Sequence, residues 1–432
     1  MAAAGFHHGL LATPSPTPMD GFDCSPDRPA TCDGVDLAAV AAAEGTPLYV
    51  YSAAGIVARY RALDAALGEW PHRIHFAMKA NSTLGVVRLL HAAGSAFDAN
   101  SGGEIGVALR AGAPPDAIVF TGVGKTEAEL TDAVRLGIGT INAESAGELD
   151  RIGRIAASRG VRARVALRVN PDIEADTHPG IATGGRAHKF GVPMGDARDI
   201  AREASTHEGL ELVGIHAHVG SQITDLDSLG RTAAAVARLA HRLQEDGVPL
   251  AHVDLGGGLG IAYDAAEAPS VDAYARLLVD AVRPTGLTLL VEPGRWIVGP
   301  TGALIATVVD VKPQADGRHF VVLDAGMSEL LRPALYGSAH RLHLLQPRDG
   351  PPVTCDVVGP ICETTDVVGL GQRMPLPQVG DRILVRDAGA YGVAMASNYN
   401  RHPLPAEALI ADGAWTLIRR RQSVDEMMAS EL

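Results

Sequence analysis

The sequence predicts an α/β protein, built as a TIM-type (β/α)8 barrel with a C-terminal mostly-β domain. Eight short apolar runs alternate with Ala- and Arg-rich segments of helical periodicity. After about residue 300, β-type runs such as GALIATVVDVKP and DRILVRDAG follow one another with few helical segments. A chain of 432 residues is also long enough to form two domains.

The eight apolar runs have the length of β-strands, and seven of them clearly precede a helical segment. They are residues 73–80, 96–101, 117–122, 140–145, 164–171, 212–221, 252–258 and 287–295. Alternating βα units of this number and length predict a barrel. The structural alternative is a doubly wound sheet, which would need about five or six strands per domain in an order that the sequence does not show.

Three segments are expected along the chain. Residues 1–45 form a loose lead-in and a segment that joins the β domain, because another strand, TPLYVYS, precedes the first barrel run. Residues 46–300 are expected to form the barrel, and residues 301–432 the β-rich domain that completes the active site. The insertion at residues 172–193 is the candidate lid.

Composition and charge exclude several classes of function. The net charge of −13 and the pI of about 5.6 argue against nucleic acid or a membrane surface as the main partner. No apolar run approaches the roughly 20 residues of a membrane span. The N-terminus lacks the features of a secretory signal, and the four cysteines form no CxxC pair, so we expect a reducing, cytoplasmic location without zinc or disulfides. Cys24, Cys32 and Cys355 receive no role, and Cys355 is expected to be buried.

Unusual residues fall at the ends of four predicted barrel strands. Lys79, one of only four lysines, ends the first run, and His218 ends the sixth. The glycines of GGGLG (256–260) end the seventh run, and EPGR (292–295) ends the eighth. Because a barrel brings the C-terminal ends of its strands to one rim, these features are predicted to meet in one site.

Together these residue types describe a site for pyridoxal phosphate. Lys79 supplies an amine for a Schiff base, and glycine backbone N–H groups can approach a phosphate closely. Glu292 lies at an apolar strand end, where an unpaired carboxylate is costly. Its cationic partner is either Arg295 or a protonated heterocyclic nitrogen, and the second option would make the cofactor ring an electron sink.

Other interpretations of these motifs are weaker. The glycines could form only a tight turn, and Ile261 stands where a dinucleotide-binding fingerprint needs glycine. TGVGKTE resembles a Walker motif, but Val119 replaces its first glycine. HAH places His216 and His218 on one face of a strand, as in metal-dependent barrel hydrolases, although no clear further ligands accompany them. The preferred interpretation is that one histidine packs against its neighbours and the other stacks on a flat ligand.

The motifs taken together resemble a known family over about residues 46–412. FAMKAN, HVGSQI, GGGLG, EPGR, RPALY, GPICETTD and GAYGVAMASNYN are similar to motifs of the pyridoxal-phosphate-dependent decarboxylases with the alanine-racemase fold. The stretch NPDIEADTHPGIATGGRAHKFG resembles the diaminopimelate decarboxylases rather than the ornithine or arginine enzymes.

The resemblance implies a cofactor role for one set of positions. Lys79 matches the Schiff-base lysine, His218 the residue stacked on the ring, and Glu292 the partner of the ring nitrogen. The phosphate is expected near Ser221, Gly257, Gly258, Pro293, Gly294 and Arg295, and Tyr391 is expected to contact both cofactor and substrate.

The resemblance implies a substrate role for a second set. Arg295, Arg332 and Tyr336 match substrate-binding positions. Cys362 matches the proton donor and Glu363 a substrate ligand, both contributed by the partner subunit of a homodimer. Considered alone, Cys362 would be a buried core residue, Arg332 a surface residue and Tyr391 a turn aromatic.

The sequence therefore predicts decarboxylation of meso-2,6-diaminopimelate to L-lysine and carbon dioxide, the last step of lysine biosynthesis. The alternatives are a decarboxylase of the same fold that acts on ornithine or a carrier-bound amino acid, a non-catalytic homologue, or a metal-dependent hydrolase.

Overall fold

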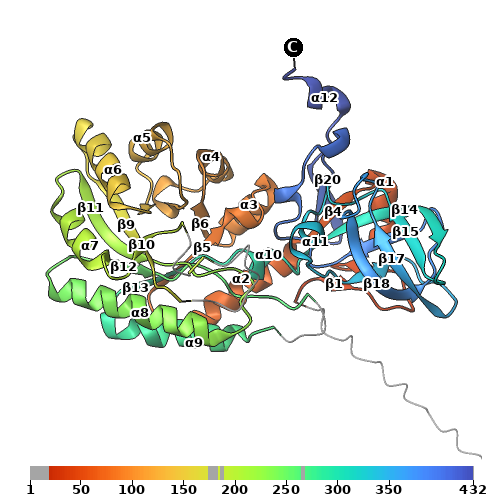
Figure 1. Cartoon of the computed structure of the whole chain (residues 1–432), viewed down its shortest axis with the longest axis horizontal. Helices are drawn as coiled ribbons and strands as arrows, with labels where there is room; N and C mark the ends of the chain where they lie inside the picture. The colour runs from red at the N-terminus through yellow and green to blue at the C-terminus, as the bar shows by residue number, and fades with distance from the viewer. Residues whose placement is uncertain (1–18, 174–182, 185–188, 264–267, 432) are drawn as a thin grey trace, which may run out of the picture.

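The computed structural model describes residues 19–173, 183–184, 189–263 and 268–431. Most of the expected lid, at 174–182 and 185–188, lies outside these ranges. None of the helices in the described ranges combines the length and apolar composition that a membrane span needs. Figure 1 shows a barrel on one side of the molecule and a mostly-β domain on the other.

Within the described residues, eight parallel strands close into a barrel, which confirms the predicted fold class. Pairing of the last strand with the first, at Leu289 and His72, completes the closure. In chain order the barrel strands are β5 (His72–Ala77), β6 (Ala96–Ala99), β7 (Ile118–Phe120), β8 (Thr140–Ala143), β9 (Ala163–Asn170), β11 (Leu210–His216), β12 (His252–Asp254) and β13 (Thr288–Val291).

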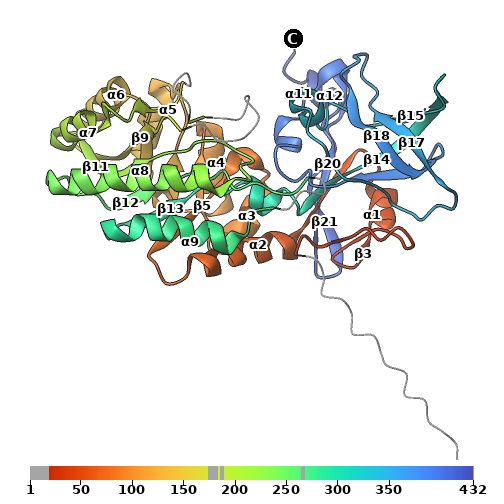
Figure 2. The same ribbon diagram turned by 60° about the horizontal axis from the view of Figure 1, so that its bottom comes forward.

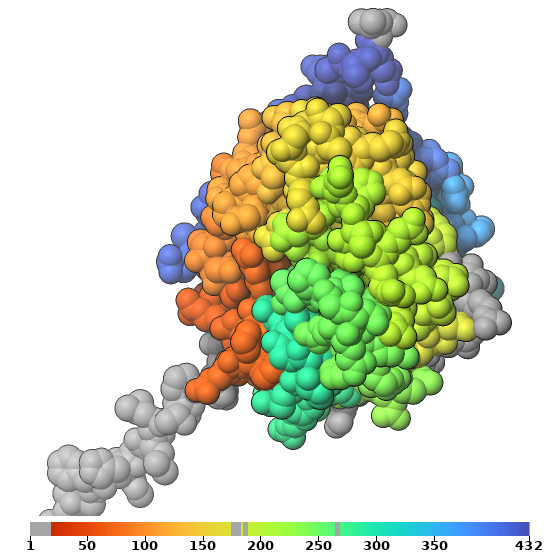
Figure 3. Space-filling model, turned by 90° about the vertical axis from the view of Figure 1, so that its left-hand side faces the viewer, coloured from red at the N-terminus to blue at the C-terminus, as the bar shows by residue number. Residues whose placement is uncertain are grey.

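Helices surround the barrel and bury their apolar faces against its strands. Figure 3 shows the ring end-on, with the colours following the chain around it from orange through yellow and green to teal. The helices are α2 (Ala53–Leu67), α3 (Leu84–Ala92), α4 (Gly102–Ala111), α5 (Glu127–Leu136), α6 (Ala146–Ser158), α7 (Ala197–Thr206), α8 (Leu226–Glu245) and α9 (Val271–Val282). Helix α2 precedes the first strand and packs beside α9, so it closes the ring (Figure 2).

Local sequence signals explain where these helices begin and end. At α5, Thr126 and Glu129 form a capping box that satisfies free N–H groups of the first turn. Gly137 ends the same helix with a positive φ of 68°, a conformation that glycine adopts without steric cost.

A second, nine-stranded sheet forms the β domain around the long strand β14 (Gly302–Pro313). The other strands are β4 (Leu48–Ser52), β15 (His319–Leu323), β16 (Leu342–Leu344), β17 (Pro352–Val358), β18 (Val367–Pro375), β19 (Arg382–Val385), β20 (Ala406–Ala411) and β21 (Ala414–Arg419). Strand β4 pairs with β14 and β20, so the range 46–300 expected for the barrel includes one strand of this sheet. All five β4 residues are buried, and a fully buried strand carries no periodicity that would assign it to either sheet.

The N-terminal segment packs on the β domain. Short strands β1 (Phe22–Asp23), β2 (Thr31–Cys32) and β3 (Val35–Asp36) lead into α1 (Leu37–Glu44). Phe22 and Leu37 share a small core with Ala303 of β14 and Leu384 of β19. This core is separate from the larger one, which extends from the barrel into the β domain, for example at Phe76 and Val321.

Candidate active site

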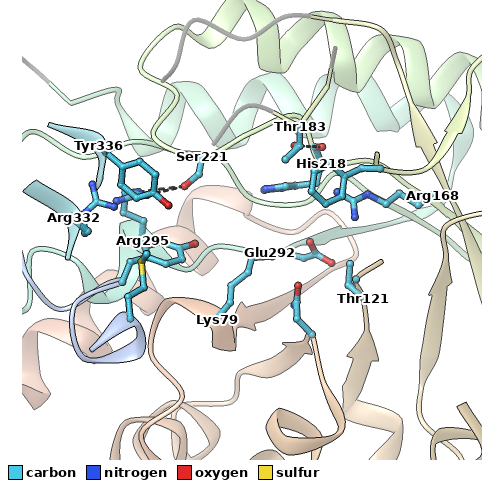
Figure 4. Close-up of a pocket in the computed structure, with 15 residues that line it drawn as sticks. Lys79, Thr121, Arg168, Thr183, His218, Ser221, Glu292, Arg295, Arg332 and Tyr336 are labelled. Carbon is cyan, nitrogen blue, oxygen red and sulfur yellow. Dashed lines mark hydrogen bonds between the residues drawn. The ribbon is translucent and has the colours of Figure 1, made fainter. Parts of the chain in front are cut away.

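A cavity of about 250 Å³ opens where the C-terminal ends of the barrel strands face the β domain. Figure 4 shows Lys79 and Glu292 at its centre, with arginines from both domains on one side. The lining residues are Lys79, Asn100, Thr121, Gly122, Arg168, Thr183, Phe190, His218, Ser221, Glu292, Arg295, Arg332, Tyr336, Tyr391 and Met395. The cavity therefore brings together Lys79, His218, Glu292 and Arg295 of the predicted rim, whereas Gly257, Gly258, Pro293 and Gly294 are not among the described residues that line it.

Lys79 lies in a 3₁₀ turn, Met78–Ala80, just after β5 rather than within the strand as expected. Its Nζ atom is 3.3 Å from Asp98 Oδ2, at the end of the neighbouring strand β6. Burial alone would lower the pKa of Lys79, but Asp98 and Glu292 outweigh it and raise the pKa above its usual value. The structure thus holds a primary amine in the cavity beside a buried acid that balances its charge.

Glu292 follows β13 directly and is only 2% exposed. His216 Nε2 lies 3.3 Å from its Oε2 atom, whereas Oε1 has no hydrogen-bond partner among the described residues. Burial would raise the pKa of Glu292, but His216 and then Lys79 lower it below its usual value. Glu292 is therefore an ionised acid with one acceptor oxygen still unused.

His218 lines the cavity, and the glycine loop contacts this histidine. The N–H of Gly257 donates to Nδ1 of His218 over 3.1 Å. Burial, followed by the charge of Lys79, holds the pKa of His218 well below its usual value, so the ring is neutral and can accept this bond. A Cβ atom on Gly257 would lie 2.2 Å from the carbonyl oxygen of Glu292, and Gly258 has a φ of 107°. Larger residues would force these two loops apart.

A pair of buried arginines forms the opposite wall. Arg295 begins the short helix α10 (Arg295–Val298) and donates to Ser221 Oγ and Tyr263 Oη. Arg332 begins α11 (Arg332–Tyr336) in the β domain and donates to Ser338 Oγ. Among the described residues, neither arginine forms an ion pair with a carboxylate. Two desolvated cations without an acidic partner make a site for an anionic group.

Two hydrogen bonds hold the loop that carries Tyr391, in the β domain, against the barrel rim. The N–H of Tyr391 donates to the carbonyl oxygen of Ala80 over 2.8 Å, and Asn81 Nδ2 donates to the carbonyl of Gly389 over 3.1 Å. The guanidinium of Arg295 lies over the Tyr391 ring, 4.7 Å from its centroid. Tyr391 is thus placed beside Lys79 and the arginine wall at once.

Cys362 and Glu363 do not line this cavity in the described part of the chain. Cys362 is exposed, with Asn400 Nδ2 3.4 Å from its Sγ atom, so the alternative of a buried core cysteine is wrong. The carboxylate of Glu363 accepts a hydrogen bond from the hydroxyl of Tyr399. Cys355, by contrast, is buried as expected.

Two charged residues at the cavity were missed by the sequence analysis. Asp98 pairs with Lys79, and Arg168 forms a 2.6 Å ion pair with Glu144 beside the ring of Phe190. Both stand inside apolar strands, in AFDANS and VALRVN. A charge inside an apolar run was the signal used for Glu292, and applied consistently it would have found these two residues as well.

The arrangement fits pyridoxal phosphate. It presents a primary amine, a flat neutral imidazole, and an ionised buried acid with one oxygen that has no partner among the described residues. A family model described as "Pyridoxal-dependent decarboxylase, pyridoxal binding domain" matches residues 53–299. Fold and site together thus define a decarboxylase, a carboxy-lyase whose cofactor is pyridoxal phosphate.

Individual relatives identify the family more closely. Diaminopimelate decarboxylase of Neisseria meningitidis serogroup A is 41% identical, covering 93% of this chain and 98% of its own. That of Pseudomonas aeruginosa is 42% identical, covering 96% and 99%. The diaminopimelate decarboxylase of Helicobacter pylori complexed with L-lysine superimposes with a TM-score of 0.88 at 37% identity, covering 91% and 98%. That of M. jannaschii in co-complex with L-lysine gives 0.91 at 32% identity, covering 96% and 98%. The chain belongs to the diaminopimelate decarboxylase family.

Proposed function

We propose that this protein removes carbon dioxide from meso-2,6-diaminopimelate to form L-lysine, the last step of lysine biosynthesis. The observation that carries the proposal is the pair of buried arginines, Arg295 and Arg332, which line the cavity with Lys79 and Glu292 and have no carboxylate partner among the described residues. Diaminopimelate has a second carboxylate far from its reacting carbon, and planar guanidinium groups bind carboxylates through paired hydrogen bonds. Ornithine lacks this carboxylate and would leave the buried donors of Arg295 and Arg332 unpaired.

In the proposed reaction, one C–C bond breaks, carbon dioxide leaves, and a proton takes its place on the same carbon. Pyridoxal phosphate, when bound, supplies an electron sink for the pair left on that carbon. Lys79 would hold the cofactor through its amine, and His218 would cover the ring. Glu292 would keep a proton on the ring nitrogen, because its ionised carboxylate can accept a hydrogen bond there. Tyr391 orients cofactor and substrate between the two domains.

The glycine loop and its neighbours are proposed to hold the phosphate. Gly257 and Gly258 lie so close to the carbonyl oxygens of Glu292 and Gly220 that a Cβ atom would not fit, and the backbone N–H groups of this loop are the proposed donors to the phosphate. Ser221 offers a hydroxyl, and the segment from Pro293 through Gly294 to Arg295 runs beside this loop. A Cβ atom on Gly294 would lie 2.8 Å from the Cβ of Ala80, so only glycine fits so close to the lysine turn.

The proton donor is proposed to come from a second copy of the chain. Cys362 and Glu363 are exposed on the β domain and are not among the described residues that line the cavity of their own chain. In a homodimer, the partner's thiol would protonate the carbon, and the partner's carboxylate would bind the distal ammonium together with Tyr336. The proposed location is the cytoplasm, where the four cysteines, all free, would stay reduced.

The test is a substrate panel with the cofactor-loaded protein. Carbon dioxide release is measured from meso-diaminopimelate, ornithine, arginine and lysine at equal concentrations. We expect release from diaminopimelate to dominate. A preference for substrates without the distal carboxylate would instead support a same-fold decarboxylase of another amino acid, and no release from any substrate would support a non-catalytic homologue.

A further inference from the structure

Behind the cavity wall, three ionisable side chains meet in the barrel interior. His216 ends β11, Asp254 ends β12 and Glu292 follows β13, so neighbouring strands bring them together. Their exposed fractions are 0%, 0% and 2%. One side-chain nitrogen or oxygen of each lies within 4.8 Å of the others. Of the three, only Glu292 lines the cavity, so His216 and Asp254 can act on a ligand there only through Glu292.

The hydrogen bonds within this triad are incomplete. His216 Nε2 and Glu292 Oε2 are 3.3 Å apart. Asp254 Oδ1 accepts the N–H of Gly256 over 2.9 Å, at the start of the glycine loop. Among the described residues, Asp254 Oδ2 and Glu292 Oε1 have no partner. Two buried carboxyl groups therefore lie close together, each with one bare oxygen.

Electrostatics does not allow both carboxyl groups to be ionised at this distance without solvent. Such a pair holds one proton between its members, and the surroundings decide which member carries it. His216 contacts Glu292 directly and favours its ionised form. Burial, and then the charge of Glu292, raise the pKa of Asp254 well above its usual value. The proton therefore belongs to Asp254.

Further ionisable groups face the triad from several elements. Lys79 favours an ionised Glu292, whereas Asp98 on β6 opposes a charge on Asp254. The remaining groups are His75 of β5, His218 after β11, Tyr274 of α9, and His252 of β12, whose pKa is lowered by burial to about 4 so that its ring is neutral. Burial lowers the pKa of His75 to about 3 and holds that of His218 well below its usual value, so both rings are neutral. Burial raises the pKa of Tyr274, which stays a neutral phenol. These groups leave the placement of the proton on Asp254 unchanged.

We propose that His216 and Asp254 are positioning residues that keep Glu292 ionised beneath the cofactor ring. His216 donates its Nε2–H to Oε2 of Glu292, and Asp254 stays neutral, so that no second negative charge lies beside Glu292. The unused oxygen of Glu292 is then a full acceptor for the ring nitrogen. The proposal rests on the cofactor use within the proposed function, but it concerns the protein without substrate.

The experiment reads the protonation of the ring nitrogen directly, by ¹⁵N NMR of protein loaded with pyridoxal phosphate labelled at that nitrogen. In the unmodified protein we expect the protonated signal at neutral pH. His216→Leu removes the donor and should move the signal to the neutral position, or lower the pH of its transition by roughly one unit or more. His216→Gln keeps an N–H near the Nε2 position and should restore the protonated signal.

A matched control separates this effect from the loss of any buried histidine. His252 is 6% exposed, and its Nε2 has no partner among the described residues, yet it does not belong to the triad. His252→Leu should leave the ring signal unchanged even if it lowers the thermal midpoint. A shift of equal size in His252→Leu and His216→Leu would overturn the proposal.

Variants at Asp254 test which acid carries the proton. Asp254→Asn resembles the neutral acid in shape, can still accept from Gly256, and places no charge beside Glu292, so the protonated ring signal should persist. Loss of that signal in a folded Asp254→Asn protein would show that Asp254 acts as an anion and would overturn the proposal. Stoichiometric metal in the triad, found by elemental analysis, would overturn it as well.

The two proposals fail in different ways. A protonated ring that responds to His216→Leu, in a protein that releases no carbon dioxide from diaminopimelate, would reject the proposed function and leave this inference standing. Turnover of diaminopimelate with a neutral ring nitrogen in the unmodified protein would reject this inference alone.

Discussion

Lys79 is an example of a single residue whose position in the sequence indicated this site. A chain with four lysines places one of them at the end of an apolar run, and there it faces the buried acid Asp98. Glu292 was predicted in the same way, because it is a charged residue at the end of an apolar strand. Burial makes such charges costly unless they are paired, so their presence in a sequence indicates a partner or a function. The partner itself, Asp98 for Lys79, follows only from the packing of β5 beside β6.

At this scale we predict the effect of removing the amine. Lys79→Ala should lower carbon dioxide release by roughly 10³-fold or more, because no other described residue of the cavity offers a primary amine. Borohydride reduction followed by peptide mass spectrometry should find the cofactor on the peptide of Lys79 in the unmodified protein and on none in the variant. Lys125, buried against Glu148 on the flank of the barrel, is the internal control. Labelling of its peptide would contradict the assignment.

Among the elements, β4 and β20 connect the two domains. Glu407 of β20 accepts hydrogen bonds from Tyr51 of β4, at 2.6 Å, and from Thr83, at 3.0 Å, just before α3 of the barrel. Arg419 of β21 pairs with the same carboxylate over 3.0 Å. Burial raises the pKa of Glu407, while Arg419 lowers it. One buried side chain thus joins β4, β21 and the segment before α3, and it holds the barrel rim at Thr83 against the β sheet.

Removing this link should destabilise the protein. Glu407→Leu would leave the buried hydroxyls of Tyr51 and Thr83 unpaired, and we expect a loss of about 3 kcal/mol in the free energy of unfolding. Urea denaturation measures the change. Glu407→Gln keeps an acceptor oxygen and should recover part of the loss, whereas Glu431→Leu at the exposed pair with Arg401 should leave the midpoint in place. Equal midpoints for Glu407→Leu and the unmodified protein would contradict this role.

The sequence predicted most helices and strands correctly, but it did not assign every strand to the correct sheet. The eight barrel strands were expected within a few residues of their observed ends, because each alternates with a helix whose apolar stripe is readable. Strand β4 was placed with the barrel, since nothing in five buried residues distinguishes one sheet from another. Sheet membership depends on hydrogen bonds to residues about 250 and 360 positions away, at Gly302 and Ala406, which local patterns do not report.

At the scale of the whole molecule, the separation of Cys362 from Lys79 within one chain bears on assembly. The proposed homodimer makes a specific prediction for mixtures of two inactive proteins. Lys79→Ala and Cys362→Ala are each expected to release little carbon dioxide. After subunit exchange, half of the dimers would be hybrids, each with one intact site of two, so activity should recover to about a quarter of the unmodified level.

Two controls accompany this mixing experiment. Differently tagged subunits that co-purify must show that exchange has taken place. A mixture of Lys79→Ala with Lys79→Ala/Cys362→Ala cannot form an intact site and should stay inactive. No recovery in the first mixture despite proven exchange would contradict a site shared between two chains.

The sequence by itself determined which chemical groups the protein possesses and which local elements carry them. Periodicity, capping residues and misplaced charges are local properties, so the barrel strands, the glycine loop, Lys79 and Glu292 were all readable. Only the tertiary structure determined which of these side chains are neighbours. Strand order brings His216, Asp254 and Glu292 within reach of one another, and the β sheet carries Tyr391 and Arg332 to the barrel rim. Such contacts arise from closure and packing over hundreds of residues, where no local pattern sets the distance.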